Sequence, residues 1–135
     1  MEFTWLSRWQ PQLLALLRIF AGLLFLEHAT QKFFAFPAPF PMPGPLPPML
    51  MAAGVIELVA GVLITIGLFT RLAAFIASGE MAIGYFLMHF PQGFWPAINK
   101  GEAAILFCFV FLFLAAAGPG AWSVDAARTR NAPIR

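Results

Sequence analysis

The chain has 135 residues, of which 61% are hydrophobic and 10% are charged, and its mean hydropathy is +0.82. Soluble domains are about half apolar and a quarter charged, so this composition excludes an ordinary soluble domain and indicates a membrane protein. The net charge of +2 comes from scattered basic residues without a basic run, which excludes nucleic acid as a partner and leaves the lipid bilayer.

The first apolar segment covers residues 12–34. Trp5 and Trp9 precede it, as is typical of a membrane-interface anchor, and Pro11 is typical of a helix start. Arg18 and Glu27 interrupt the apolar run, whereas a cleaved signal peptide has an uninterrupted apolar core. We therefore expect an uncleaved membrane span.

The next segment, FPAPFPMPGPLPP, is so rich in proline that it excludes a helix and predicts an extended loop. Two further apolar segments follow, and the turn between them at Arg71 is so short that they must form an antiparallel hairpin. A second loop, PQGFWPAINKG, precedes the last apolar segment, which the GPG at 118–120 ends. A helix of about 20 residues crosses a bilayer core. The four predicted spans are residues 12–34, 50–69, 72–90 and 102–117.

These segments predict an all-α fold, a four-helix transmembrane bundle forming a single domain over residues 1–128, with a flexible tail at 129–135. Basic residues are more frequent in cytoplasmic loops, which sets the orientation. Five arginines fall on the side of the two termini, against Lys32 and Lys100 on the other side, so we expect both termini in the cytoplasm. The five arginines are Arg8, Arg71, Arg128, Arg130 and Arg135.

Inserting a charged side chain into a membrane span costs about 2.5 to 3.5 kcal/mol of free energy on insertion scales. Charged residues inside the spans therefore indicate a structural or functional role. Arg18 lies about 9 Å and Glu80 about 12 Å from the cytoplasmic ends of their spans at 1.5 Å per residue. Because the two depths agree, we predict a structural ion pair between Arg18 and Glu80; the alternative is a carboxylate that handles a proton or binds a ligand.

A second set of polar residues lies toward the outer ends of the spans. His28 and Lys32 fall on one helix face, and Glu57 lies on a face with Gly54 and Gly61, which would allow close helix approach. Lys32 and Glu102 could also simply extend to the membrane surface from the helix ends. The sequence predicts an outward-opening, ligand-binding pocket lined by His28, Lys32, Glu57, His89 and Glu102.

No sequence motif indicates a specific reaction. The histidines and carboxylates lack HxxxH or ExxH spacing, so we predict no metal site. No serine lies in a nucleophile elbow, and the single cysteine, Cys108, excludes a disulfide framework and a CxxC redox pair. Whether the chain is an enzyme stays open, and its catalytic residues stay unknown.

Three stretches between Arg18 and Asp125 form one pattern: RIFAGLLFLEHATQKFF, GVIELVAGVLITIGLFTRLAAFIASGEMAIGYFLMH and GFWPAINKGEAAILFCFVFLFLAAAGPGAWSVD. This pattern resembles the DoxX family of small bacterial four-helix membrane proteins. Ala29, Lys100 and Val124 depart from the family's pattern. The matching positions are Arg18, Gly22, His28, Lys32, Glu57, Gly61, Asn99, Glu102, Gly118 to Gly120, Ser123 and Asp125.

The resemblance implies a multi-pass protein of the bacterial cytoplasmic (inner) membrane. The family takes its name from a subunit associated with a terminal quinol oxidase and thiosulfate oxidation. One hypothesis is therefore an accessory subunit of a larger respiratory or photosynthetic membrane complex, with a homo-oligomer as an alternative assembly. The other is a redox-associated subunit, in the enzymatic case a quinone-linked oxidoreductase subunit, that binds a quinone or similar ligand in the outer pocket.

Overall fold

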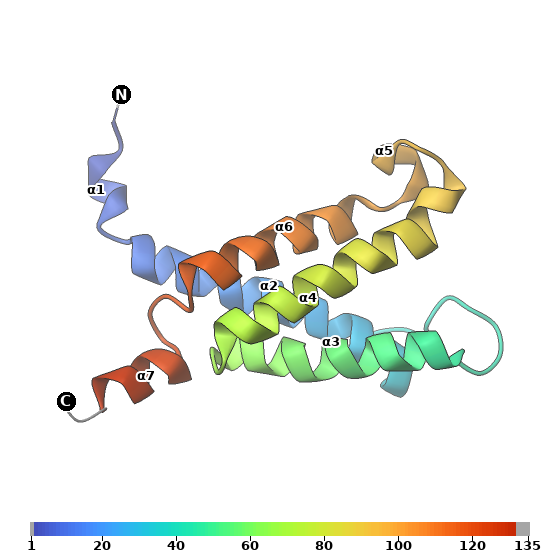
Figure 1. Ribbon diagram of the computed structural model, residues 1–135, viewed down its shortest axis with the longest axis horizontal. Helices are drawn as coiled ribbons and strands as arrows, with labels where there is room; N and C mark the ends of the chain where they lie inside the picture. Colours follow the sequence, from blue (N-terminus) through green and yellow to red (C-terminus); the bar gives the residue numbers. More distant parts are fainter. Residues whose placement is uncertain (1, 132–135) are drawn as a thin grey trace.

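The computed structural model describes residues 2–131, in which every regular element is a helix (Figure 1). The four long helical segments coincide with the predicted spans to within three residues at each end, so the all-α prediction is confirmed. The predicted tail begins inside a helix that extends to Arg130, and residues 132–135 lie outside the described part. The elements are α1 (Thr4–Ser7), α2 (Gln10–Phe34), α3 (Pro48–Ile66), α4 (Thr70–Gly84), the π-helical turn η1 (Tyr85–His89), the 3₁₀ turn η2 (Phe90–Gln92), α5 (Pro96–Asn99), α6 (Glu102–Ala117) and α7 (Val124–Arg130).

The long helices form two antiparallel hairpins. Helix α2 packs along α3, helix α4 packs along α6, and contacts between α3 and α4 join the two pairs. Figure 1 shows α1, α7 and the α3–α4 turn at one end of the molecule, which we call the α7 end. The proline-rich loop and α5 lie at the opposite end, the α5 end (Figure 1).

Three helical segments are long and apolar enough to cross a membrane: Gln10–Phe34, Pro48–Ile66 and Thr70–Gln92. Helix α6 is also apolar but has only 16 residues, a length of about 24 Å at 1.5 Å per residue. Helix length therefore supports three of the four predicted spans directly.

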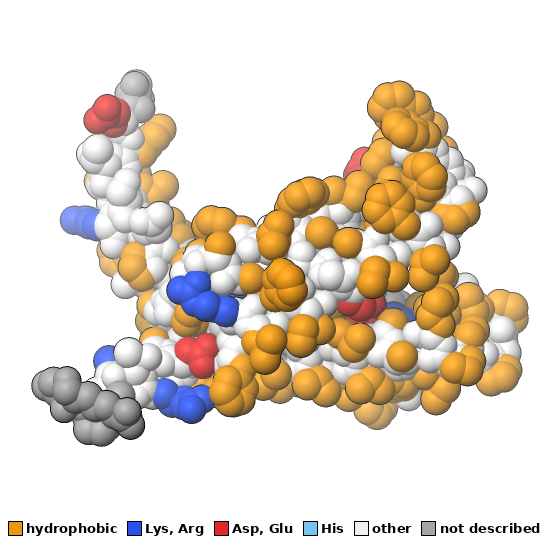
Figure 2. All heavy atoms as spheres, in the orientation of Figure 1, with side chains coloured by type: hydrophobic (Ala, Val, Ile, Leu, Met, Phe, Trp, Pro, Cys, Tyr) orange, Lys and Arg blue, Asp and Glu red, His pale blue; other side chains and the backbone are white. Residues whose placement is uncertain are grey.

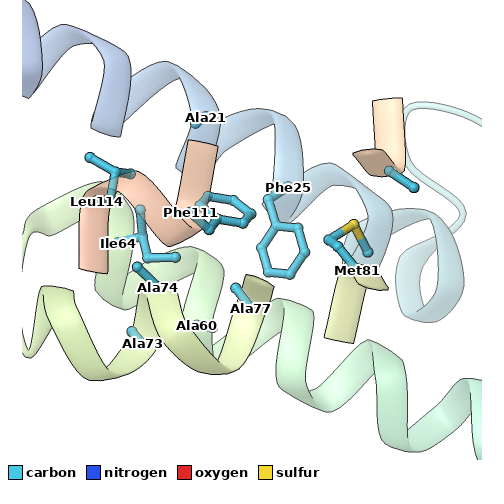
Figure 3. Packing of buried hydrophobic residues seen from close by; sticks show 11 residues of the cluster. Ala21, Phe25, Ala60, Ile64, Ala73, Ala74, Ala77, Met81, Phe111 and Leu114 are labelled. Carbon is cyan, nitrogen blue, oxygen red and sulfur yellow. The ribbon is translucent and has the colours of Figure 1, made fainter. Parts of the chain in front are cut away.

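The packing of the helices is that of a protein surrounded by lipid. Most of the buried apolar side chains are alanine, and the larger ones include Phe25, Ile64, Met81, Phe111 and Leu114 (Figure 3), with Leu50 near the start of α3. Large apolar side chains instead cover the outside of the helices, as the orange surface in Figure 2 shows. Because hydrocarbon tails solvate such side chains as well as a protein core does, small residues at the helix contacts are what membrane bundles favour. The protein is embedded in a lipid bilayer.

Glycines bring α2 and α3 into close contact. A Cβ atom at Gly22 would lie 2.6 Å from Oγ1 of Thr65, and one at Gly61 would lie 3.1 Å from Cα of Leu26. These distances leave no room for a side chain, so the two glycines set the separation of the helices.

Gly67 ends α3 with a φ of +73°, a left-handed conformation that glycine adopts without a steric penalty. A Cβ atom there would also collide with Cβ of Ser123. We expect Gly67→Ala to lower the free energy of unfolding by more than about 1 kcal/mol.

The matched control is Gly79→Ala. Gly79 lies within α4 with no atom near the position of an added Cβ, so alanine should stabilise the helix by up to about 1 kcal/mol. Thermal unfolding of both variants in detergent measures the two changes, and equal shifts would contradict the turn geometry.

Candidate functional site

A buried ion pair links α2 to α3 in the half of the bundle toward the α5 end. Nζ of Lys32 lies 2.7 Å from Oε2 of Glu57, and the two side chains are only 6% and 3% exposed. Gly54 lies beside this contact, because a Cβ atom there would lie 2.7 Å from Cζ of Phe33 and 3.2 Å from Cδ of Lys32. The Phe40 ring of the proline-rich loop lies 5.1 Å from Lys32 Nζ, within the range of a cation–π interaction.

Helix α4 adds a second carboxyl group. The carboxyl group of Glu80 lies within hydrogen-bonding reach of that of Glu57, and Lys32 is near enough to influence it electrostatically. Oε2 of Glu80 is buried, and no donor among residues 2–131 reaches it. A buried oxygen without a donor is costly, so this position requires a chemical explanation.

His28 lies one helical turn before Lys32 on the same face of α2. It lies near enough to Glu57 and Lys32 for an electrostatic interaction, and its ring packs edge-on against Phe107 of α6, with 5.9 Å between ring centroids. We call the four residues His28, Lys32, Glu57 and Glu80 the central polar cluster.

The other two residues of the predicted outer pocket lie elsewhere. Nδ1 of His89 is 3.1 Å from the carbonyl oxygen of Asn99, and its ring stacks on Tyr85. The buried Asn99 side chain donates to the Tyr85 hydroxyl and the Gly93 carbonyl. His89 thus belongs to a hydrogen-bonded network that fastens the second loop.

Glu102 lies in the first turn of α6 with an exposed side chain. Its negative charge suits the positive end of the helix dipole at that position. Of the five residues predicted to line one pocket, His28, Lys32 and Glu57 lie together in the central polar cluster, while His89 and Glu102 lie outside it.

The predicted ion pair between Arg18 and Glu80 is not formed. The fully buried Arg18 guanidinium instead donates to the carbonyl oxygens of Pro119, Ala121 (3.1 Å) and Trp122 (2.8 Å). Side chains on a helix point toward its N-terminus, and the N-terminus of α2 lies at the α7 end (Figure 1). The Arg18 side chain therefore extends toward the α7 end. Glu80 belongs to the other hairpin and contacts Glu57.

Asp125 completes the contacts at the α7 end. Its carboxylate accepts hydrogen bonds from the backbone amides of Phe69 and Thr70, both 2.9 Å long, at the start of α4. Burial alone would raise the pKa of Asp125, but the hydrogen bonds from Thr70 and Phe69, with the charge of Arg128, outweigh burial and hold this pKa below its usual value. Arg18 and Asp125 therefore hold the α6–α7 loop and α7 against the hairpin ends.

Replacing Asp125 with asparagine is expected to lower the melting temperature at neutral pH. A carboxylate with a lowered pKa stabilises the fold above its unfolded-state pKa, near 4, and this contribution is lost as the pH falls through the folded-state pKa. The difference between wild type and Asp125→Asn should thus shrink below about pH 4. Melting curves across this pH range measure it, and a constant difference would contradict the role of the charge.

Two hollows lie on the surface away from the central polar cluster. One, of about 1010 Å³, lies between α1, α2 and α6 at the α7 end, and the other, of about 330 Å³, is an apolar slot between α3 and α4. Neither is lined by a residue of the cluster. Within residues 2–131 no group of three His, Cys, Asp or Glu side chains could hold a metal ion.

The sequence did carry a signal for the membership of Glu80 in the cluster. Ala73 and Ala77 are buried on the packed face of α4. Glu80 comes seven residues after Ala73 and three after Ala77, so it falls on the same face of the helix. That spacing places Glu80 toward the bundle, but it does not say which neighbouring helix the side chain meets. The contact of Phe40 with Lys32 had no comparable signal, because it depends on the path of the loop.

The comparisons with known proteins place the chain among a family and two relatives. A family model described as DoxX matches residues 13–90. An uncharacterized protein of Haemophilus influenzae is 44% identical over 127 residues, covering 89% of this chain and 93% of the relative. An uncharacterized membrane protein of Mycobacterium tuberculosis is 29% identical over 139 residues, covering 90% of this chain and 85% of the relative. No solved structure matches the chain.

Proposed function

Because the chain belongs to the DoxX family of membrane proteins, we propose that it is a small accessory subunit of a larger respiratory or photosynthetic membrane complex. The observation that carries this proposal is the internal use of the charged side chains within the spans. Arg18 binds backbone carbonyls of its own chain, and Lys32 pairs with Glu57. The outer surface of the long helices is left to apolar side chains, which suits packing against other membrane helices.

The proposal includes four spans, with α6 as the fourth, and both termini in the cytoplasm of a bacterial inner membrane. Arg8, Arg71, Arg128 and Arg130 belong to the α7 end, whereas Lys100 belongs to the loop at the α5 end. This asymmetry supports a cytoplasmic α7 end, and Arg135 lies outside the described residues. A reporter that is active only in the periplasm should be inactive when fused to the C-terminus, and activity there would refute the orientation.

The apolar slot between α3 and α4 is the proposed contact with the partner subunit. It is lined by aliphatic and aromatic side chains and has a volume of about 330 Å³, enough for a few side chains of a neighbouring helix. The lining residues are Val55, Ile56, Val59, Ala60, Leu63, Phe69, Leu72, Ala73 and Ile76.

A photo-crosslinking amino acid at Val59 tests the contact in living cells. The proposal predicts a crosslink from Val59 to another membrane polypeptide. The same probe at Leu106, an exposed residue of α6, is the matched control and should give less of this product. Crosslinks from Val59 only to lipid, or only to a second copy of the chain, would refute the heteromeric subunit.

A second candidate function is a redox-associated subunit that binds a quinone or a similar small ligand. The observation that favours it is that His28 and Glu57 lie in one cluster, since an imidazole and a carboxyl group together can donate to and accept from a quinone headgroup. Organic extraction of the purified protein, followed by mass spectrometry, would find a stoichiometric quinone that His28→Ala loses. An extract without quinone from wild-type protein would refute this candidate.

A further inference from the structure

We propose that Glu57 and Glu80 hold one exchangeable proton between them, and that the bundle thereby carries a proton-binding site near the middle of the membrane. The proposal does not depend on the partner complex or on a quinone. It is based on the contact between the two carboxyl groups, their burial and the charge of Lys32.

The contact itself requires a proton. The carboxyl groups of Glu57 and Glu80 are within hydrogen-bonding reach of each other, but two ionised carboxylates are both acceptors and cannot bond. Lys32 already donates to Oε2 of Glu57. Oε2 of Glu80 is buried, and among the described residues no donor reaches it. One proton shared between the two groups supplies the missing donor.

The charge balance leads to the same count. With both carboxylates ionised, Lys32 would leave one net negative charge inside the bundle, where an unpaired charge is costly. One bound proton makes the group of Lys32, Glu57 and Glu80 neutral.

With a neutral His28, the remaining neighbours supply no second positive charge. Helix α2 contributes His28, and Glu27 acts on that histidine. Helix α6 carries only Glu102, which is exposed at its first turn. Arg71, at the start of α4, is bound to the carbonyls of Ala115 and Ala116.

The position of the site distinguishes it from a helix-end salt bridge. Glu57 is nine residues from either end of α3, and Glu80 is ten residues from Thr70, so both lie about 14 to 15 Å inside their helices. Glu80 is only partly buried. Exchange of this proton with water is part of the proposal and is tested below in D₂O.

Infrared spectroscopy of the full chain in lipid nanodiscs tests the proposal. At neutral pH the wild type should show the C=O stretch of one buried, protonated carboxyl group, and this band should shift in D₂O because the proton exchanges. Glu57→Gln and Glu80→Gln should each abolish the band, since either change leaves a single carboxylate that Lys32 ionises. Glu102→Gln, which removes an exposed carboxylate, should leave the band unchanged.

Two results would overturn the proposal. One is the absence of the band from the wild type at neutral pH, which needs no variant and therefore does not depend on the folding of any variant. The other is a band that persists in both Glu57→Gln and Glu80→Gln, because the proton would then belong to another group. A band that does not shift in D₂O would refute exchange.

Discussion

Replacing Arg18 with alanine is expected to lower the free energy of unfolding by at least about 3 kcal/mol. The guanidinium donates to the carbonyl oxygens of Pro119, Ala121 and Trp122, and each buried acceptor left without a donor costs about 1–3 kcal/mol. The substitution also opens a cavity where a fully buried side chain stood. Of all single changes outside the central polar cluster, we expect this one to destabilise the protein most.

Cys108 provides the measurement. It is the only cysteine in the chain, and its sulfur lies in the bundle 3.6 Å from the Ser78 hydroxyl. A fluorogenic maleimide should therefore react with it mainly when the bundle unfolds on heating. We expect a fall in melting temperature of about 10 °C or more for Arg18→Ala.

Arg18→Lys should recover only part of this loss, because an ammonium group cannot reach the carbonyls as a planar guanidinium does. Arg130→Ala, at the exposed end of α7, is the control and should leave the melting temperature nearly unchanged. If Arg18→Ala melted like wild type, the proposed role of Arg18 in fastening the loop after α6 would be wrong.

The second large effect is expected for Lys32→Met. Methionine keeps most of the apolar volume but leaves Glu57 and Glu80 without a positive charge, and breaking a buried ion pair costs about 3–5 kcal/mol. Adding Glu57→Gln to Lys32→Met should restore most of the stability, since Glu80 can then be neutral and hydrogen-bonded to the amide.

A double-mutant cycle measures this coupling. The unfolding free energies of wild type, Lys32→Met, Glu57→Gln and the double variant give the interaction energy, which we expect to exceed about 1 kcal/mol. Additive losses would show that the 2.7 Å contact between Lys32 and Glu57 contributes nothing to stability.

The helices could be predicted from the sequence, because apolar runs, prolines and the GPG segment define where each begins and ends. The contact of Lys32 with Glu57 followed in part from the same reasoning, since the glycines beside Glu57 indicate the face on which α2 approaches α3.

The partners of Arg18 and Glu80 could not be predicted in this way. Counting residues gives the depth of a side chain in the membrane, but it does not give the order of helices around the bundle. Arg18 and Glu80 have similar depths on separate hairpins, so agreement in depth wrongly suggested a pair. The backbone carbonyls that Arg18 binds carry no sequence signal at all, because any residue supplies one.

The loop contacts were beyond prediction for a related reason. Asn99 fastens the second loop through Tyr85 and Gly93, and Phe40 reaches Lys32 from the proline-rich segment. Both contacts depend on the path by which an irregular loop folds back on the helices. The spacing of apolar residues in the sequence does not predict that path.

The mass of the intact particle, extracted from native membranes in a mild detergent, tests the proposed subunit most directly. The chain alone has a mass of 14.8 kDa. We predict a larger particle that contains at least one other membrane polypeptide. Val59→Trp, which fills the slot between α3 and α4, should release the chain from it, while Leu106→Trp on α6 should not. A particle that contains only this chain, at 14.8 kDa or a multiple of it, would contradict the account.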